Sequence, residues 1–281
     1  MMENKSESFS PRTPDTGLSG AELVNPYDNS GEERKALQVE RMFDSIAPSY
    51  DFMNTAMTLG LCARWRDKAL NLVDEVLSRA GRKAPANVLD VATGTGDVAF
   101  AMAARWPGCH ITGIDLSSEM LKKAEEKLET VPDSSASRLS FIQADCLRLP
   151  FKDASFDLVT VAYGVRNFER LSEGYREMFR VLRPGGLLCV IELSRPDGVL
   201  TGPLYDIYTR TLIPLAGRII SGDTRAYSYL PESIAAAPQR SAMTHIMKEA
   251  GFSSCIWKSL TFGAATIYLA VRPGIHRSDR G

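Results

Sequence analysis

The chain of 281 residues is 44% hydrophobic, which is enough for one large domain or two small ones with a substantial core. Its 33 Lys and Arg nearly balance 34 Asp and Glu, and the net charge of −1 argues against a nucleic-acid partner held mainly by phosphate contacts. Five scattered cysteines without a CxxC pair and three distant histidines argue against a disulfide framework or a metal site, and favour a reducing compartment.

The sequence carries no pattern typical of secretion or of a membrane span. Residues 1–15 are polar and lack the apolar core of a signal peptide. No run approaches the roughly 20 apolar residues that a spanning helix needs. We therefore expect a cytoplasmic protein.

Composition divides the chain into a domain and two tails. Residues 1–33 are rich in Ser, Pro, Gly and Asn, which predicts a solvated and disordered tail. A single domain is expected over 34–273, followed by a short tail over 274–281. At the start of the domain, apolar residues recur at helical spacing from Val39 to Ile46.

The segment between the first two expected helices is unusually polar. Ala47-Pro48 breaks the first helical pattern, and a second helix is expected to begin near Leu61. Tyr50-Asp51 and Asn54 lie between them and are more polar than a core contact needs. These helices either pack on the sheet or cover a ligand cleft, and the pattern allows both.

Strands and helices alternate regularly from Asn87 onward. Strands are expected at 88–92, 110–115, 139–144, 156–163 and 187–193, and helices at 97–106, 117–130 and 171–182. This alternation predicts a parallel sheet with helices on both faces, an α/β Rossmann-like fold. Ligands of such sheets bind outside the carboxyl ends of the strands.

The first expected strand runs into a glycine turn. Gly94-Thr95-Gly96 follows strand 88–92 and precedes a helix, an arrangement that brings bare backbone close to a ligand. Asp115 ends the next strand, where a carboxylate can accept hydrogen bonds from ribose hydroxyls. The pattern predicts a cofactor that contains a nucleoside.

The segment 200–237 interrupts the alternation. It is strongly apolar and aromatic at helical spacing, which suits a helical lid over an apolar substrate, although an ordinary packed helix pair fits the same pattern. A helix is expected at 239–250. Strands at 252–260 and 264–271, joined by Phe262-Gly263, predict an antiparallel hairpin at the edge of the sheet.

Two cofactors fit the glycine turn. Gly94-x-Gly96-x-x-Ala99 matches the dinucleotide fingerprint, with an acid about 20 residues further on, so an NAD-dependent oxidoreductase is one interpretation. However, the chain ends in a hairpin instead of a second mononucleotide unit, and Asp145-Cys146 closes the third strand, where an adenine edge could be read. This arrangement resembles class I S-adenosylmethionine-dependent methyltransferases, whose sheet ends in a reversed strand.

Four motifs narrow the resemblance to one family. They are Tyr50-Asp51-x-Met53-Asn54 with Trp65, Gly164-Val165-Arg166-Asn167, the segment 180–194 around Arg183-Pro184-Gly185-Gly186, and Tyr227-x-Tyr229-Leu230-x-Glu232-Ser233-Ile234. In this order they resemble the menaquinone and ubiquinone biosynthesis C-methyltransferases. Thr58, Cys62 and Arg183 depart from the family pattern of Ser, His and Lys. Cys62 removes an imidazole, so we expect no acid–base role there.

The resemblance implies methylation of a ring carbon in a polyprenylated quinol, with S-adenosylmethionine as donor and no metal. The implied cofactor residues are Gly94, Thr95 and Gly96 for the methionine part, Asp115 for the ribose, Asp145 and Cys146 for the adenine, and Ala162 at the cleft floor. The implied catalytic residues are Arg166 and Asn167, facing the reacting ring, and Tyr50 and Tyr229, orienting the quinol or moving a proton.

Plainer roles remain open for three of these residues. Asp115 could be a surface acid that starts a helix, Arg166 a structural ion-pair residue, and Tyr229 a packing residue. Among reactions, the alternatives are a sterol or other lipid methyltransferase and a non-catalytic partner of a quinone-biosynthesis assembly. Demethylmenaquinol is preferred over 2-methoxy-6-polyprenyl-1,4-benzoquinol as the acceptor, because Thr58 and Cys62 depart from the dual-substrate pattern.

The polyprenyl tail of the expected substrate resides in a bilayer. The apolar stretch 200–220 therefore predicts a transient contact with the membrane surface, peripheral on its inner face. A homodimer is a further expectation, and no nucleic-acid partner is expected.

Overall fold

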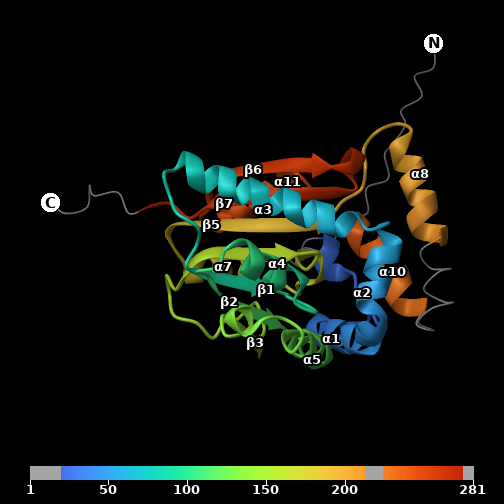
Figure 1. Cartoon of the computed structure of the whole chain (residues 1–281). Coiled ribbons are helices and arrows are strands. Elements are labelled where there is room, and N and C mark those ends of the chain that lie inside the picture. Colours follow the sequence, from blue (N-terminus) through green and yellow to red (C-terminus); the bar gives the residue numbers. More distant parts are fainter. Residues whose placement is uncertain (1–19, 213–223, 275–281) are drawn as a thin grey trace, which may run out of the picture.

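The computed structural model describes residues 20–212 and 224–274, and its centre is a twisted sheet (Figure 1). The seven strands are β1 Asn87–Val91, β2 His110–Asp115, β3 Leu139–Gln143, β4 Phe156–Ala162, β5 Leu182–Leu193, β6 Ser253–Leu260 and β7 Ala265–Val271. Their order is β3-β2-β1-β4-β5-β7-β6. Neighbouring strands among the first five run parallel, whereas β7 is antiparallel to both β5 and β6. The expected parallel sheet and reversed hairpin are confirmed.

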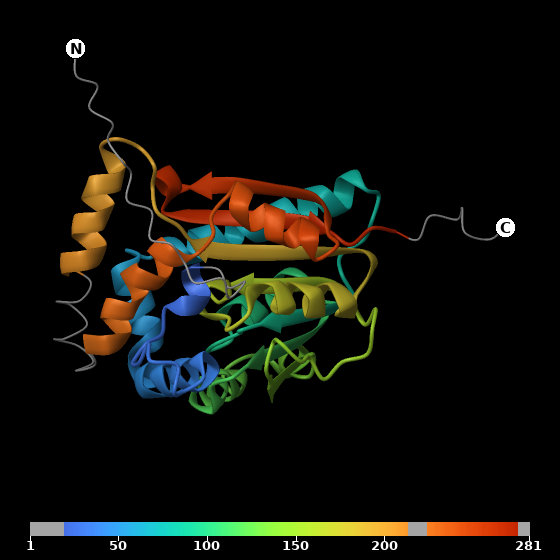
Figure 2. The same cartoon turned by 180° about the vertical axis from the view of Figure 1, so that it is seen from behind.

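Helices cover both faces of the sheet, which explains why its central strands are apolar on both sides. On one face, α3 Leu61–Arg79 and α4 Asp97–Arg105 form a core with Val88 and Ile111. On the other, seen in Figure 2, α7 Leu171–Val181 and α11 Ser241–Glu249 pack on Leu89 and Val159. α5 Ser118–Leu128 lies beside β2 and β3, and its Ser117 cap accepts the Met120 N–H.

The Arg183–Gly186 segment lies in a strand, although the sequence pattern predicted a helix stop followed by a strand at 187. α7 ends at Val181 and β5 begins at once with Leu182. The pairing with β4 shifts between Phe156↔Leu182 and Leu158↔Leu187, so this segment forms an irregularity in the ladder. Gly185 has φ +80°, a conformation that favours glycine.

The residues before the first long helix are organised from residue 20 on, which corrects the expected tail over 1–33 for its described part. η1 Gly20–Leu23 is anchored by Glu22, whose carboxylate accepts the backbone N–H of Leu171 at 2.5 Å. The Gln38 side chain accepts the N–H groups of Tyr27 and Asp28. Composition misses this order, because the partners are supplied by helices far along the chain. Residues 1–19 and 275–281 lie outside the described residues.

The amino-terminal helices and the 200–237 segment meet at the carboxyl ends of the strands (Figures 1 and 2). α1 Lys35–Ile46, the short turn η2 Ala47–Ser49 and α2 Tyr50–Met57 follow one another; the sequence pattern did not predict α2. Facing them are α8 Thr201–Ile207, the π-helical turn η4 Tyr208–Leu212 and α10 Thr224–Ala236. Residues 213–223 of the expected lid fall outside the described part.

Three short elements complete the description: α6 Asp133–Ala136, η3 Val165–Asn167 and η5 Thr261–Gly263. Within 20–212 and 224–274, no helix is long and apolar enough to cross a bilayer.

Candidate active site

The glycine turn is tied to the sheet by a buried carboxylate. Asp90 lies within β1 and accepts the hydroxyls of Thr93 at 2.6 Å and Thr160 at 2.5 Å. Burial raises the pKa of Asp90 to about 6. Gly94 and Gly96 have φ +57° and +83°, and a Cβ on Gly96 would come within 2.8 Å of the Phe100 ring. The turn therefore requires glycine and keeps its backbone close to the strand ends.

Asp115 joins this turn to the next strand. Its Oδ2 accepts the Gly94 N–H at 2.8 Å, and its Oδ1 accepts the Ser117 N–H at 3.0 Å. Burial raises the pKa of Asp115. Asp115 is therefore more than a surface acid that starts a helix. Each carboxylate oxygen has further acceptor capacity, so the group can still accept hydrogen bonds from a ligand.

Two hollows flank the turn. The first, the strand-end cleft, is lined by Gly94, Asp115, Leu116, Ala144, Asp145, Cys146, Ala162 and Asn167, among others. The second, the turn cavity, is lined by Asp51, Arg66, Asp90, Thr93, Gly94, Thr95, Asp97 and Ala162, among others. The structure thus brings six of the seven expected cofactor residues to these hollows. Gly96 lines neither, and its part is to shape the turn.

Thr95 is engaged with protein groups through its side chain. Its hydroxyl donates to Asp51 Oδ1 at 2.6 Å and accepts from Lys127 Nζ at 2.9 Å. Lys127 also pairs with Asp51 at 2.7 Å and with Asp97 at 2.8 Å. This network links α2, the glycine turn and α5, so the helix that the sequence left unassigned is held against the turn.

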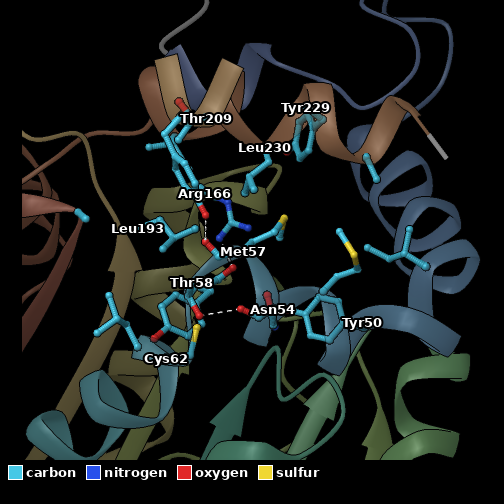
Figure 3. Close-up of a pocket in the computed structure, with 18 of the residues that line it drawn as sticks. Tyr50, Asn54, Met57, Thr58, Cys62, Arg166, Leu193, Thr209, Tyr229 and Leu230 are labelled. Carbon is cyan, nitrogen blue, oxygen red and sulfur yellow. Dashed lines mark hydrogen bonds between the residues drawn. The ribbon is translucent and has the colours of Figure 1, made fainter. Parts of the chain in front are cut away.

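A third hollow, the apolar cavity, opens between α2, α8 and α10 (Figure 3). Its volume is about 190 Å³, and its apolar lining includes Met42, Phe43, Ile46, Met53, Met57, Leu61, Trp65, Leu193 and Leu230. Tyr50 and Tyr163 line this cavity, the strand-end cleft and the turn cavity alike. The three hollows therefore meet at these two tyrosines.

Arg166 reaches the apolar cavity from η3 as a buried ion pair. Its Nη1 donates to Glu192 Oε1 at 2.8 Å and also to the Tyr163 carbonyl oxygen. The Arg166 backbone N–H donates to Glu192 Oε2 at 3.2 Å. Its Nε is buried and has no hydrogen-bond partner among the described residues. Arg166 is thus an ion-pair residue and a lining residue at once.

The neighbouring Asn167 lines a different hollow from Arg166, and the expectation that both face the reacting ring stays a prediction. Asn167 lines the strand-end cleft, and its Oδ1 accepts the Tyr229 hydroxyl at 3.1 Å. Adjacent residues of the short helical turn η3 point in different directions, a divergence that the linear motif does not reveal. Tyr229 lines the apolar cavity and fastens α10 to η3.

Sequence reasoning missed two site residues. Arg66 lines the turn cavity, and its Nε is buried without a partner in the part of the chain described. Tyr163 follows β4 with φ +58°, and its hydroxyl oxygen is likewise buried and unpartnered there. Arg66 directly follows Trp65 of the first motif, and Tyr163 directly precedes Gly164 of the second. Neither motif, however, indicates that Arg66 Nε and Tyr163 Oη lack hydrogen-bond partners among the described residues. Within the described ranges, no three His, Cys, Asp or Glu residues are grouped as metal ligands.

Comparison with known proteins agrees with this geometry. A demethylmenaquinone methyltransferase of Porphyromonas gingivalis is 42% identical over 91% of this chain and 100% of its own length. One of Bacteroides fragilis is 40% identical over 89% of this chain and 98% of its own length. A solved S-adenosylmethionine-dependent methyltransferase of Thermotoga maritima has a TM-score of 0.57 at 15% identity, over 83% of this chain and 99% of that one, and supports the class I methyltransferase fold.

The family model described as the ubiE/COQ5 methyltransferase family matches residues 29–272, which cover all three hollows and the four sequence motifs. The chain belongs to the ubiE/COQ5 methyltransferase family.

Proposed function

We propose that the protein transfers a methyl group from S-adenosylmethionine to a ring carbon of demethylmenaquinol, producing menaquinol. The observation that carries this proposal is the meeting of three hollows at Tyr50 and Tyr163. Two of them are polar enough for a nucleoside and an amino acid, and the third is lined mainly by apolar side chains. The names of the relatives, demethylmenaquinone methyltransferases, support the choice of acceptor.

The strand-end cleft would hold the adenosine part of the cofactor. Asp115 would accept the ribose hydroxyls with the oxygens that already hold Gly94 and Ser117. Asp145 and Cys146 would border the adenine above the floor formed by Ala162. Asp145 is kept in place by the Leu147 N–H, which donates to its Oδ1 at 2.9 Å.

The turn cavity would hold the methionine part. The backbone of Gly94 and Thr95 would approach the amino-acid end, with Gly96 shaping the turn. Arg66, whose Nε lacks a partner among described residues, would pair with the cofactor carboxylate. Asp97 Oδ2 lies 3.7 Å from Arg66 Nη1 and keeps that side chain at the cavity.

When bound, S-adenosylmethionine supplies a methyl group already activated by its sulfonium sulfur. The protein must place the quinol carbon against it and favour the loss of the neighbouring hydroxyl proton. After the transfer, the methylated carbon loses its ring proton, which restores the aromatic phenolate, and the phenolate oxygen regains a proton from solvent. Arg166 would stabilise the developing phenolate in a cavity lined mainly by apolar side chains, and Glu192 would hold the guanidinium in position. Burial raises the pKa of Tyr50 to about 12, so Tyr50 acts as a neutral hydrogen-bonding group that orients the quinol.

The activity assay combines the purified protein, labelled S-adenosylmethionine and chemically reduced demethylmenaquinone. We expect label in menaquinol, and little label when the methoxy-benzoquinol is the acceptor. Calorimetry with S-adenosylmethionine and with NAD is run beside it, and binding is expected for the former alone. If the protein binds S-adenosylmethionine but labels no quinol, the acceptor assignment is wrong.

We further propose that this cytoplasmic protein takes its acceptor from a bilayer through α8. Tyr205 of α8 and Tyr208 at the start of η4 line the apolar cavity. On the outside, Leu200, Leu204 and Ile207 are 85%, 69% and 62% exposed. A helix that is apolar on both its cavity side and its outer side suits shallow insertion into a lipid surface, which is where a polyprenyl chain lies. A homodimer remains a prediction for sedimentation equilibrium to test.

The variant Leu204→Asp with Ile207→Asp is expected to reduce binding to phosphatidylcholine–phosphatidylglycerol vesicles about tenfold or more, because both apolar contacts with the lipid are lost. Flotation measures the bound fraction. Ile256→Asp, on the edge strand β6 and 52% exposed, is the matched control and should bind like the parent. Equal loss in both variants, or in neither, would refute docking through α8.

A further inference from the structure

The apolar cavity contains two buried polar atoms that have no hydrogen-bond partner in the described part of the chain, Tyr163 Oη and Arg166 Nε. Two other hydroxyls of its lining have protein partners. Thr58 donates to the Asn54 carbonyl at 2.6 Å, and Tyr229 to Asn167 at 3.1 Å. A buried polar atom without a partner destabilises the folded protein, so such atoms are unusual unless a ligand pairs with them.

Both atoms are held by one short loop at the end of β4. The Tyr163 N–H donates to the Ile191 carbonyl at 2.7 Å, and its ring contacts Trp65 with centroids 6.5 Å apart. Arg166 is bound to the Tyr163 carbonyl and to Glu192. Tyr163 and Arg166 therefore line the same cavity from one loop, and the hydroxyl of one and the Nε of the other are buried there without partners among the described residues.

A hydroquinone ring carries two oxygens on opposite sides, which matches the two unpartnered atoms in number. Building on the proposed function, we propose that the Tyr163 hydroxyl binds the quinol oxygen remote from the reacting carbon. Arg166 Nε binds the oxygen beside that carbon, because a cation is best placed where negative charge develops. Tyr163 thereby makes the enzyme select acceptors that carry both oxygens.

The chemistry of Tyr163 fits a neutral partner. Burial raises the pKa of Tyr163, so the phenol keeps its proton and can donate it in a hydrogen bond. Burial also raises the pKa of Cys62, which leaves the thiol neutral. The remote quinol oxygen thus meets neutral groups and keeps its own proton, while the oxygen at Arg166 loses one. Tyr163 is accordingly a residue of specificity and positioning.

The test crosses one substitution with two acceptors. Tyr163→Phe removes only the hydroxyl. The acceptors are reduced demethylmenaquinone and a prenylated naphthol that keeps only the hydroxyl next to the reacting carbon. We expect the parent to prefer the quinol, and Tyr163→Phe to reduce that preference, measured as the ratio of kcat/KM values, about 10- to 100-fold. Taking the ratio between enzymes cancels the intrinsic difference in reactivity between the two acceptors.

Tyr175→Phe is the matched control, because it removes a hydroxyl from a fully buried tyrosine in the α7 core, outside the three hollows. It should keep the parent's preference, and the dissociation constant of S-adenosylmethionine should change less than about twofold in Tyr163→Phe. Equal losses with both acceptors, an unchanged preference, or weakened cofactor binding would overturn the assignment of Tyr163. A parent protein that methylates neither acceptor would instead overturn the proposed function.

Discussion

The double variant Arg166→Met with Glu192→Gln is expected to fold and to bind S-adenosylmethionine, but to methylate demethylmenaquinol about 10³-fold more slowly than the parent. The reason is that Arg166 is the one cation among the described residues that line the apolar cavity, where the phenolate would form. Loss of one such preorganised donor typically costs about 10²–10³ in rate, and loss of its charge adds to this. Single-turnover label transfer measures the step directly.

The substitutions are paired because the ion pair is deeply buried. Arg166→Met alone leaves the Glu192 carboxylate without its partner, which we expect to cost about 3–5 kcal/mol of stability. Glutamine at 192 removes the buried charge and keeps one acceptor oxygen. Because the Arg166 N–H donates to Glu192 Oε2 and the Leu193 N–H to Oε1, the amide nitrogen leaves one of these two donors without its acceptor, a smaller loss than an unpaired buried carboxylate. Urea unfolding should therefore find the double variant more stable than Arg166→Met. A stable double variant with parental turnover would show that Arg166 is only a structural residue.

Asp115→Asn is expected to weaken S-adenosylmethionine binding about 100-fold, as measured by calorimetry. The carboxylate is proposed to accept the ribose hydroxyls, and charged hydrogen bonds of this kind contribute about 1.5–3 kcal/mol. An amide nitrogen would in addition face either the Gly94 or the Ser117 N–H, which are both donors. Asp44→Asn is the matched control, because Asp44 accepts from Ser117 Oγ at 2.6 Å outside the three hollows.

The same carboxylate gives cofactor affinity a pH dependence of known sign. Burial raises the pKa of Asp115 above its ordinary value. The ionised group is the better acceptor, so affinity should be full above the raised pKa and fall as the pH drops through it. Asp115→Asn should flatten this fall, whereas Asp44→Asn should retain it. If cofactor affinity in Asp115→Asn depends on pH as it does in the parent, the titrating group is not Asp115.

The regular part of the fold follows from the linear pattern. From Val88 onward, apolar runs bounded by turn residues mark the central strands, because strands buried on both faces need such runs. Gly94 and Gly96 are identifiable from the sequence because the turn demands positive φ. Asp115 is identifiable because the carboxyl ends of parallel strands share one edge of the sheet. These are local properties of the chain or direct consequences of strand order.

The apolar cavity depends on contacts between distant segments. α2 is held by the contacts of Asp51 with Thr95 and Lys127, and η1 by a hydrogen bond to Leu171, partners 44 to 149 residues away in sequence. Periodicity and composition contain no record of such contacts.

Side-chain direction and hydrogen-bond satisfaction were likewise decided by the tertiary structure. Arg166 and Asn167 are adjacent in the motif but face different hollows, because η3 turns the chain between them. Tyr163 Oη and Arg66 Nε became candidates only when their surroundings were seen to offer no partner within the described residues. Residue type and order therefore predicted the architecture and the edge of the sheet at which the cofactor is expected to bind. Packing placed the groups that would recognise the acceptor. Whether a buried polar atom lacks a hydrogen-bond partner depends on all the residues around it, and these come from distant parts of the chain.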